Sequence, residues 1–225
     1  MIKFDDLECV FTIKIDLDLI KKLEFYYKNY IKDQDKINYH IVSPSWNSDI
    51  KWISVDSLKF YDFFKKNIFE KLNLDFLRKV IDIDKEIRLY SVFFVTRSYC
   101  NKPNFHFDFE NTNFNGYTLM TPLNEDNDQG NLLYKKNGKE KVYKYKKGEC
   151  IIFGDFFEHS TQPYQGKEMT FFCLTFGSDK EIHWKNIFGG ISTQSKNVMR
   201  FDNEFINCNE EIEKLQLYKK KNYIS

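Results

Sequence analysis

The chain has 225 residues, of which 42% are hydrophobic and 18% aromatic, so it can bury a sizeable core as one domain with flanking segments. Its formal net charge of +1 provides no long-range field to gather nucleic acid or an anionic membrane, so we expect neither as a partner. The five cysteines form no C-x-x-C pair, and their odd number favours reduced thiols in a cytoplasmic, reducing compartment over a disulfide scaffold.

The first 85 residues are predicted to be an N-terminal helical support segment. The chain opens with early acidic residues and no long apolar stretch, which predicts neither a signal peptide nor a membrane-spanning helix. Residues 15 to 33 and 56 to 80 have apolar side chains at helical spacing, and short extended stretches are expected between them, within 37 to 54. We expect the second helix to pack in the core through its apolar stripe, which consists of Phe60, Phe63, Phe64, Ile68, Phe69 and Leu72.

From residue 86 to about 178 the pattern changes to short apolar or alternating runs separated by turns such as Asn-Gly and Lys-Lys-Gly. Their number and spacing predict a jelly roll or β-sandwich. The expected strands are 88–96, 104–110, 117–123, 131–134, 141–145, 149–153, 158–164 and 168–176. Residues 179–225 are expected to form a C-terminal extension, with a helix over 208–222 that packs on the core. The predicted fold class is therefore α+β, with a double-stranded β-helix (jelly-roll or cupin-like) core braced by N-terminal helices.

A candidate metal motif lies on the second expected strand. His106 and Asp108 are two residues apart, so in a strand their side chains share a face. His159 follows a turn, a strand and a second turn, and it could bring a second imidazole to the same point. Two histidines and one carboxylate leave one face of an octahedral ion open, as in non-haem Fe(II) oxygenases. The H-x-D pair alone is weakly specific because 33 residues are acidic, and a polar strand face with a surface ion pair is the alternative.

A longer ordered set of motifs surrounds these residues. The set consists of His106-Phe107-Asp108, Gly130-Asn131-Leu132, Lys147-Gly148-Glu149 through Phe153, His159, Pro163 and Gly166-Lys167. It resembles the Fe(II)/2-oxoglutarate-dependent dioxygenase superfamily, and most of all its prolyl-hydroxylase-like branch, over roughly residues 86 to 178. The resemblance implies that His106, Asp108 and His159 are the metal ligands and catalytic residues. It also implies Fe(II), 2-oxoglutarate and O2 as cofactor and co-substrates, with ascorbate in a supporting role, and hydroxylation with release of succinate and CO2.

The 2-oxoglutarate anchor departs from the family pattern. The family places Arg or Lys nine or ten residues after the distal histidine, where this chain has Glu168 and Met169. The nearest base is Lys167, which could form charge-assisted hydrogen bonds with the far carboxylate. Arginines on the first core strand are alternatives, and a tyrosine could add a hydrogen bond. The candidates for binding the co-substrate are Lys167, Tyr90, Tyr117, Arg88 and Arg97.

The substrate class stays open at this point. A protein side chain of prolyl type and a small amino-acid-like metabolite both fit. The polar residues 111 to 116 follow the metal motif directly, which predicts a flexible loop that covers the substrate. Two other functions remain: a cupin-like metalloenzyme that does not use 2-oxoglutarate, and a non-catalytic jelly-roll module that binds sugar or protein.

Overall fold

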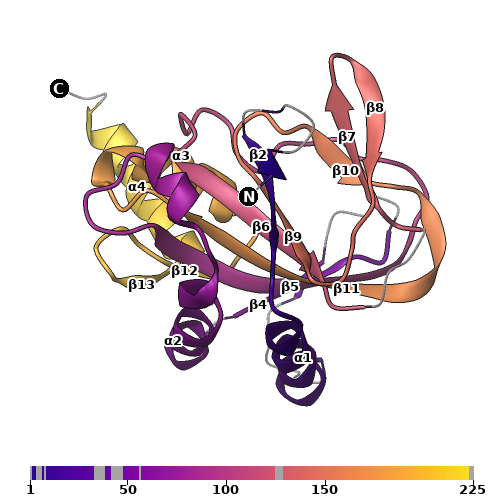
Figure 1. Ribbon diagram of the computed structural model, residues 1–225. Coiled ribbons are helices and arrows are strands. Elements are labelled where there is room, and N and C mark those ends of the chain that lie inside the picture. The colour runs from indigo at the N-terminus through magenta and orange to yellow at the C-terminus, as the bar shows by residue number, and fades with distance from the viewer. Residues whose placement is uncertain are drawn as a thin grey trace.

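The computed structural model describes residues 2–3, 7, 9–32, 39–41, 48–55, 57–124 and 129–222. It combines helices with antiparallel sheets (Figure 1). The helices are α1 (Leu17–Tyr26, continued by a π-helix at Tyr27–Ile31), α2 (Leu58–Asn67), short 3-10 turns at Phe69–Lys71 and Asp75–Lys79, α3 (Glu181–Ile191) and α4 (Cys208–Asn222). The strands are β1 (Ile2–Lys3), β2 (Val10–Lys14), β3 (Tyr39–Ile41), β4 (Lys51–Ser54), β5 (Arg88–Cys100), β6 (Gly116–Pro122), β7 (Leu132–Lys136), β8 (Lys139–Tyr143), β9 (Glu149–Phe153), β10 (His159–Thr161), β11 (Tyr164–Gly177), β12 (Asn197–Met199) and β13 (Phe205–Asn207).

A large sheet and a small sheet form the centre of the molecule. The large sheet has the strand order β1-β2-β9-β6-β11-β5-β4-β3, and the small sheet has the order β10-β7-β8. A separate two-stranded ribbon joins β12 to β13. Each of these neighbouring pairs is antiparallel. Mixed helices and antiparallel sheets agree with the predicted α+β class.

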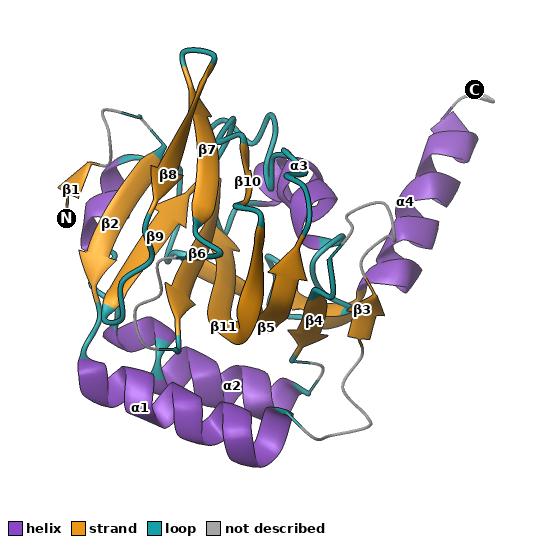
Figure 2. Ribbon diagram, turned by 90° about the vertical axis from the view of Figure 1, so that its right-hand side faces the viewer, coloured by secondary structure: helices purple, strands orange, loops and turns teal. Residues whose placement is uncertain are grey.

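The two longest strands, β5 and β11, bury both of their faces. Phe94 and Phe172 are paired and pack with α2 residue Phe64 on one side of the sheet. Their neighbours Phe93 and Phe171 point to the opposite side, into the cluster shared with the small sheet. Figure 2 shows α1 and α2 across one face of the large sheet and the small sheet over the other. Burial of each such aromatic side chain contributes roughly 1.5–3 kcal/mol, so this three-layer packing holds the small sheet against the large one.

The first 85 residues contribute strands as well as helices. β2 pairs with β9 and β4 pairs with β5, so both lie in the large sheet. The predicted packing of the aromatic stripe is confirmed, because Phe64, Ile68 and Phe69 are buried in the core. Helix α3 was not among the predicted elements. Among the described residues, no helix combines the length and the apolar character needed to cross a bilayer.

The expected strand over 104–110 is wrong. In this segment only His106 forms a β-bridge, and its partner is His159. Pro103 has no N–H to donate just before the segment, and the backbone turns through positive φ at Asn111 directly after it. The segment is therefore a loop, called the metal loop below, which touches the small sheet at one residue pair.

Candidate metal centre

The backbone brings the two histidines side by side. His106 N–H donates to the His159 carbonyl, and His159 N–H donates to the His106 carbonyl, both at 3.0 Å. This reciprocal pair fixes the metal loop to the first residue of β10, and the two imidazole centroids are 4.5 Å apart. Side chains of directly paired residues lie on the same face of a sheet, so both rings point the same way. One bridge thus replaces the longer strand that the sequence pattern predicted.

The carboxylate of Asp108 completes a group of three ligand atoms. Its Oδ1 is 3.7 Å from Nε2 of His106 and 3.7 Å from Nε2 of His159. All three ligand atoms lie within 4.8 Å of one another. Ligand atoms on one divalent ion stand about 2.0–2.2 Å from it, so small side-chain rotations would close the group around an ion. Two imidazoles and one carboxylate form the donor set of non-haem Fe(II) sites.

Backbone carbonyls orient both imidazoles for metal binding. Nδ1 of His106 is 2.9 Å from the Asn104 carbonyl, and Nδ1 of His159 is 2.9 Å from the Phe157 carbonyl. A carbonyl can only accept, so each Nδ1 carries the proton and each Nε2 presents a lone pair. Burial lowers the pKa of His159 to about 4, although Asp108 opposes this shift. His159 is therefore neutral near pH 7, as a metal ligand must be.

Asp108 is held from two sides. Thr118 on β6 donates its hydroxyl to Oδ2 at 2.7 Å, which leaves Oδ1 facing the histidines. On the other side, a Cβ at Gly190 of α3 would stand 2.5 Å from the Asp108 carbonyl oxygen. Only a residue without a side chain permits this approach of helix and loop. Helix α3 and strand β6 thus fix the position of the one acidic ligand.

A cavity opens beside the three ligands, between the large and small sheets. Its lining residues are Ile50, Trp52, Phe93, Val95, Arg97, His106, Asp108, Thr118, Met120, Leu132, Tyr145, His159, Ser160, Thr161, Cys173 and Gln194. Half of these sixteen residues are apolar, and apolar atoms make up most of the exposed lining, which favours exclusion of water around the ligands. The cavity volume is about 60 Å³, less than the roughly 150 Å³ of a cavity that holds benzene.

No family model and no curated protein sequence matches the chain. Solved structures do match it, and they identify its fold. HygX from Streptomyces hygroscopicus, solved with nickel, 2-oxoglutarate and hygromycin B, is 8% identical with a TM-score of 0.55, over 76% of this chain and 83% of HygX. The epimerase SnoN from nogalamycin biosynthesis, with Fe3+ and alpha-ketoglutarate, is 10% identical with a TM-score of 0.57, over 76% and 79%. A Pseudomonas putida prolyl-4-hydroxylase is 16% identical with a TM-score of 0.50, over 75% and 92%.

The chain has the fold of the 2-oxoglutarate-dependent oxygenases. The structures that share this fold include a prolyl hydroxylase. Within this oxygenase fold, the candidate triad stands at the edge where the metal loop meets β10.

The five residues predicted to bind the co-substrate lie in different places in the oxygenase fold. Of these five, Arg97 lines the cavity. Its side chain is buried over the Phe171 ring, and the guanidinium carbon Cζ is 4.8 Å from the centroid of that ring. Nη2 of Arg97 donates to the Gly130 carbonyl at 3.2 Å. Nε of Arg97 is buried and has no hydrogen-bond partner within the described part of the chain.

The other four residues lie outside the cavity for identifiable reasons. Arg88 forms an ion pair with Glu86, and the Tyr90 hydroxyl donates to the Ser178 carbonyl. The Tyr117 ring stacks on Phe176 in the core on the helical side of the sheet. Lys167 is exposed on β11, where the register with β5 shifts between Gln165 and Met169.

Three further residues of the cavity were missed by sequence reasoning. Thr118 comes from the inner face of β6, Tyr145 from the segment between β8 and β9, and Gln194 follows α3. The buried Oε1 of Gln194 lacks a hydrogen-bond partner among the described residues, so it is available to a ligand. Inward alternation along β6 could have suggested Thr118. No local signal marks Gln194, because its place in the cavity depends on how α3 packs.

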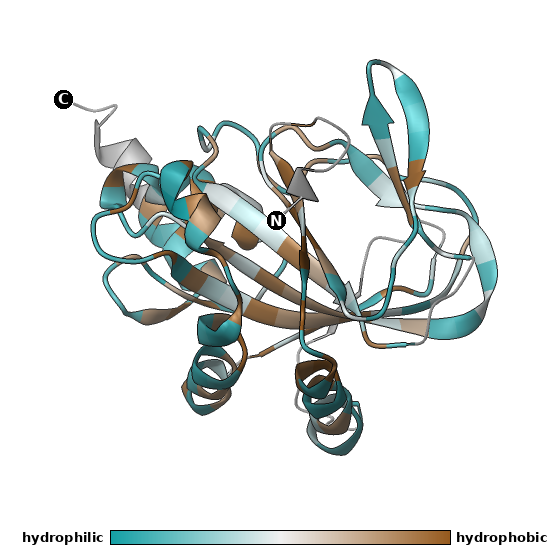
Figure 3. Ribbon diagram, in the orientation of Figure 1, coloured by the Kyte–Doolittle hydropathy of each residue, from teal (hydrophilic) through white to brown (hydrophobic). Residues whose placement is uncertain are grey.

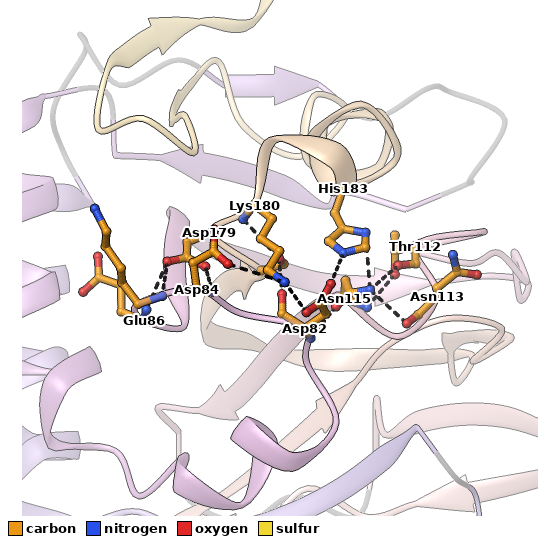
Figure 4. Close-up of polar contacts among 11 residues, drawn as sticks. Asp82, Asp84, Glu86, Thr112, Asn113, Asn115, Asp179, Lys180 and His183 are labelled. Atoms are coloured by element: carbon orange, nitrogen blue, oxygen red, sulfur yellow. Dashed lines mark hydrogen bonds and ion pairs between the residues drawn. The ribbon is translucent and has the colours of Figure 1, made fainter.

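The loop after the metal motif, which was predicted to be a flexible lid, is held by several hydrogen bonds. Buried Asp155 accepts hydrogen bonds from the Thr112 hydroxyl at 2.6 Å and the Phe114 backbone N–H at 3.1 Å. Figure 4 shows how Asn115 links this loop to His183, which in turn contacts Asp82 at 3.0 Å. These polar contacts connect the loop to the start of α3. His183 thus has a structural role, as an ordinary polar histidine would.

Proposed function

We propose that the protein is an Fe(II)- and 2-oxoglutarate-dependent oxygenase with a double-stranded β-helix core formed by the two sheets. It would hydroxylate an unactivated C–H bond of a protein side chain or of a small amino-acid-like metabolite. One observation carries this proposal: the Nε2 atoms of His106 and His159 both lie 3.7 Å from Oδ1 of Asp108, within an oxygenase fold. The orientation of both imidazoles by backbone carbonyls supports the metal role of both histidines.

The chain's own residues have distinct parts in this function. His106, Asp108 and His159 would hold the iron, and Thr118 would keep Asp108 in position. Bound iron with 2-oxoglutarate supplies an oxidant strong enough for unactivated C–H bonds. The apolar cavity wall keeps water away from the open side of the site, so that one substrate C–H bond can be aimed at it.

Arg97 is the residue that we propose for binding the far carboxylate of 2-oxoglutarate. The family places its base nine or ten residues after the distal histidine, and position 169 is ten residues after His159. Met169 occupies that position, and its cross-strand partner on β5 is Arg97. Paired residues share a face, so a guanidinium from the neighbouring strand could reach the place where the usual base would stand. Its unpartnered Nε and cavity position favour it over the exposed Lys167.

Spectroscopy under anaerobic conditions tests the function. Adding Fe(II) and then 2-oxoglutarate should produce a weak metal-to-ligand absorption band in the visible, and admitting O2 should release succinate. The Asp108→Ala variant should lose both signals. A wild-type protein that binds iron but never develops the band would instead support a cupin-like enzyme that does not use 2-oxoglutarate. A protein that binds neither would support a non-catalytic module.

Substitution at position 97 tests the anchor. Arg97→Met should weaken 2-oxoglutarate binding by roughly 100-fold, since it removes a buried charge-assisted pair. Lys167→Met is the matched control and should leave binding unchanged. Adding Met169→Arg to Arg97→Met should restore part of the affinity, because it returns the cation from the partner strand. The opposite pattern, with loss at position 167 alone, would identify Lys167 as the anchor.

A further inference from the structure

The hairpin formed by β7, β8 and the residues after it concentrates positive charge. Residues 132–148 contain seven lysines and one glutamate, a net charge of +6, whereas the whole chain has a net charge of +1. The rest of the chain is therefore acidic, at −5. Lysine takes 7 of these 17 positions but 23 of the other 208, so the general lysine richness of the chain does not explain the cluster. Figure 3 shows the hairpin as a hydrophilic projection from an apolar base.

Strand register places this hairpin at the metal end of the cavity. His159 pairs with Tyr134, and Tyr134 pairs with Lys141, so a single cross-strand row runs from His106 through His159 to Lys141. Strands are about 4.8 Å apart, which puts the Lys141 backbone about 10 Å from that of His159. The hairpin then continues past this row to its turn at Asn137 and Gly138. Its tip thus extends beyond the metal ligands.

Three lysines share the face of the hairpin that points toward the cavity. Leu132 on this face lines the cavity, and Lys136, Lys139 and Lys141 continue the same face toward and around the tip. Lys139 and Lys141 are exposed, and Lys136 is partly exposed. Lys139 and Lys141 are two residues apart, so their backbone positions are separated by about 7 Å, the spacing of alternate residues in an extended peptide.

Aromatic side chains lie near the metal ligands and near one of the hairpin lysines. Nζ of Lys135, near the tip of the hairpin and on its opposite face, is ion-paired with Glu158 and lies 4.4 Å from the centroid of the Phe105 ring, next to the ligand His106. Phe107 and Phe156 are exposed by 37% and 58%, and both stand within three residues of a metal ligand. Exposed aromatic side chains therefore stand near the metal ligands.

We propose that this lysine face binds an extended acidic segment of a protein substrate and presents one of its side chains to the metal centre. The inference rests on the proposed function and names its substrate class. β8 is the outer strand of the small sheet as described, so an extended peptide can lie along it by strand addition. Carboxylates on alternate residues of that peptide then lie on the same face as Lys139 and Lys141.

Several features favour a peptide over a nucleic acid. The basic patch is local, and the remaining surface is acidic, which opposes the approach of a long polyanion. None of the hairpin's cations is an arginine, the residue best suited to bidentate phosphate contacts. The patch also follows an open strand edge, which matches a peptide backbone.

Fluorescence anisotropy with defined peptides tests the proposal. The probe is a labelled extended peptide with glutamate at alternate positions, compared with the same peptide carrying glutamine and with a single-stranded oligonucleotide of similar length. The glutamate peptide should bind at low salt and weaken as salt rises, and the glutamine peptide should bind much less tightly. The variant Lys136→Gln/Lys139→Gln/Lys141→Gln should lose roughly tenfold in affinity for the glutamate peptide.

The matched control removes the same charge elsewhere. Lys59→Gln/Lys66→Gln/Lys71→Gln changes three exposed lysines on and near α2, across the large sheet from the hairpin (Figure 2). It should bind the glutamate peptide like the wild type. Equal binding of both peptides, equal loss in both triple variants, or preferred binding of the oligonucleotide would overturn the proposal.

Iron and 2-oxoglutarate binding separate this test from that of the function. The hairpin variant should keep the visible absorption band and the peptide-independent release of succinate, because its lysines lie on β7 and β8 whereas the ligands lie on the metal loop and β10. If the wild type shows no band but still discriminates between the peptides, the oxygenase function fails while the acidic-peptide site stands.

Discussion

The two carboxylate oxygens of Asp108 have different neighbours. This difference predicts how metal affinity changes when the Thr118 hydroxyl is replaced by a methyl group. Oδ1 faces the histidines, whereas Oδ2 accepts the hydroxyl of Thr118. Thr118→Val keeps the shape but frees the carboxylate to rotate, so we expect affinity for Ni(II) or Fe(II) to fall about tenfold. Isothermal titration calorimetry measures this metal affinity. Thr121→Val on the same strand also removes a buried hydroxyl, but one bonded to the Glu149 carbonyl, and it should leave metal affinity unchanged.

Buried His159 predicts a pH dependence for the metal-free protein. Burial lowers its pKa to about 4, while an unfolded chain has a histidine pKa of about 6.5. Between these values the unfolded state binds the proton and the folded state does not. Stability should therefore be lost as the pH falls from 6.5 toward 4, by at most about 3 kcal/mol. Urea unfolding at several pH values after chelation measures this, and His159→Gln should flatten that part of the profile; an unchanged profile would assign the loss to other groups.

Two adjacent glycines of α3 predict opposite outcomes. A Cβ at Gly190 would meet the Asp108 carbonyl oxygen at 2.5 Å and the Phe109 ring at 2.7 Å, whereas one at Gly189 has nothing within 4 Å. Gly190→Ala should push the metal loop outward, weakening metal binding and destabilising the fold by about 1–3 kcal/mol. Gly189→Ala should stabilise the helix by up to about 1 kcal/mol and leave the metal site intact. Thermal unfolding and metal titration of both variants would decide; equal behaviour would mean that the loop does not depend on this close contact.

Local patterns predicted those elements whose structure is decided locally. The apolar spacing in 15–33 and 56–80 predicted two helices, and both form, although the second ends at Asn67 and continues as short 3-10 turns. Strands such as β9 agree with their predicted bounds because turn residues flank them. The alternation of apolar and polar residues at 104–110 wrongly predicted a strand. His106 and Asp108 point in a common direction because of one β-bridge and one helix contact. Helix α3 was missed because its apolar residues follow closely, along the sequence, on those of the long strand β11.

The candidate site divides in the same way. The three ligands could be proposed from order and spacing along the chain, and the structure brings them together. Arg97 was only one of several candidates, since its relation to position 169 depends on the register of two strands more than 70 residues apart. Gln194 could not be found, because a residue beyond α3 reaches the cavity only through tertiary packing.

The metal should also stabilise the whole molecule, because its ligands join the loop after β5 to the small sheet. At a metal concentration about 100-fold above the dissociation constant, the folded state gains about 2.7 kcal/mol, which raises the melting temperature by roughly 5–10 °C in a chain of this size. Thermal unfolding with and without Ni(II) measures the shift, and a chelator should reverse it. His106→Ala should abolish the shift; a shift that persists would indicate metal binding at another site.

The pairing of β2 with β9 has a consequence for how the chain is made. Val10 pairs with Phe153, so β2 leaves the ribosome long before its partner exists. Until then its apolar residues have no sheet to join, and a chaperone that holds the nascent N-terminus would shorten that exposure. A protein shortened from its N-terminus past Lys14 would leave β9 without its partner β2. β9 would then be an exposed edge strand that is open to self-association. The shortest stable version of this protein should therefore keep its first strands, far in sequence from the residues that bind the metal.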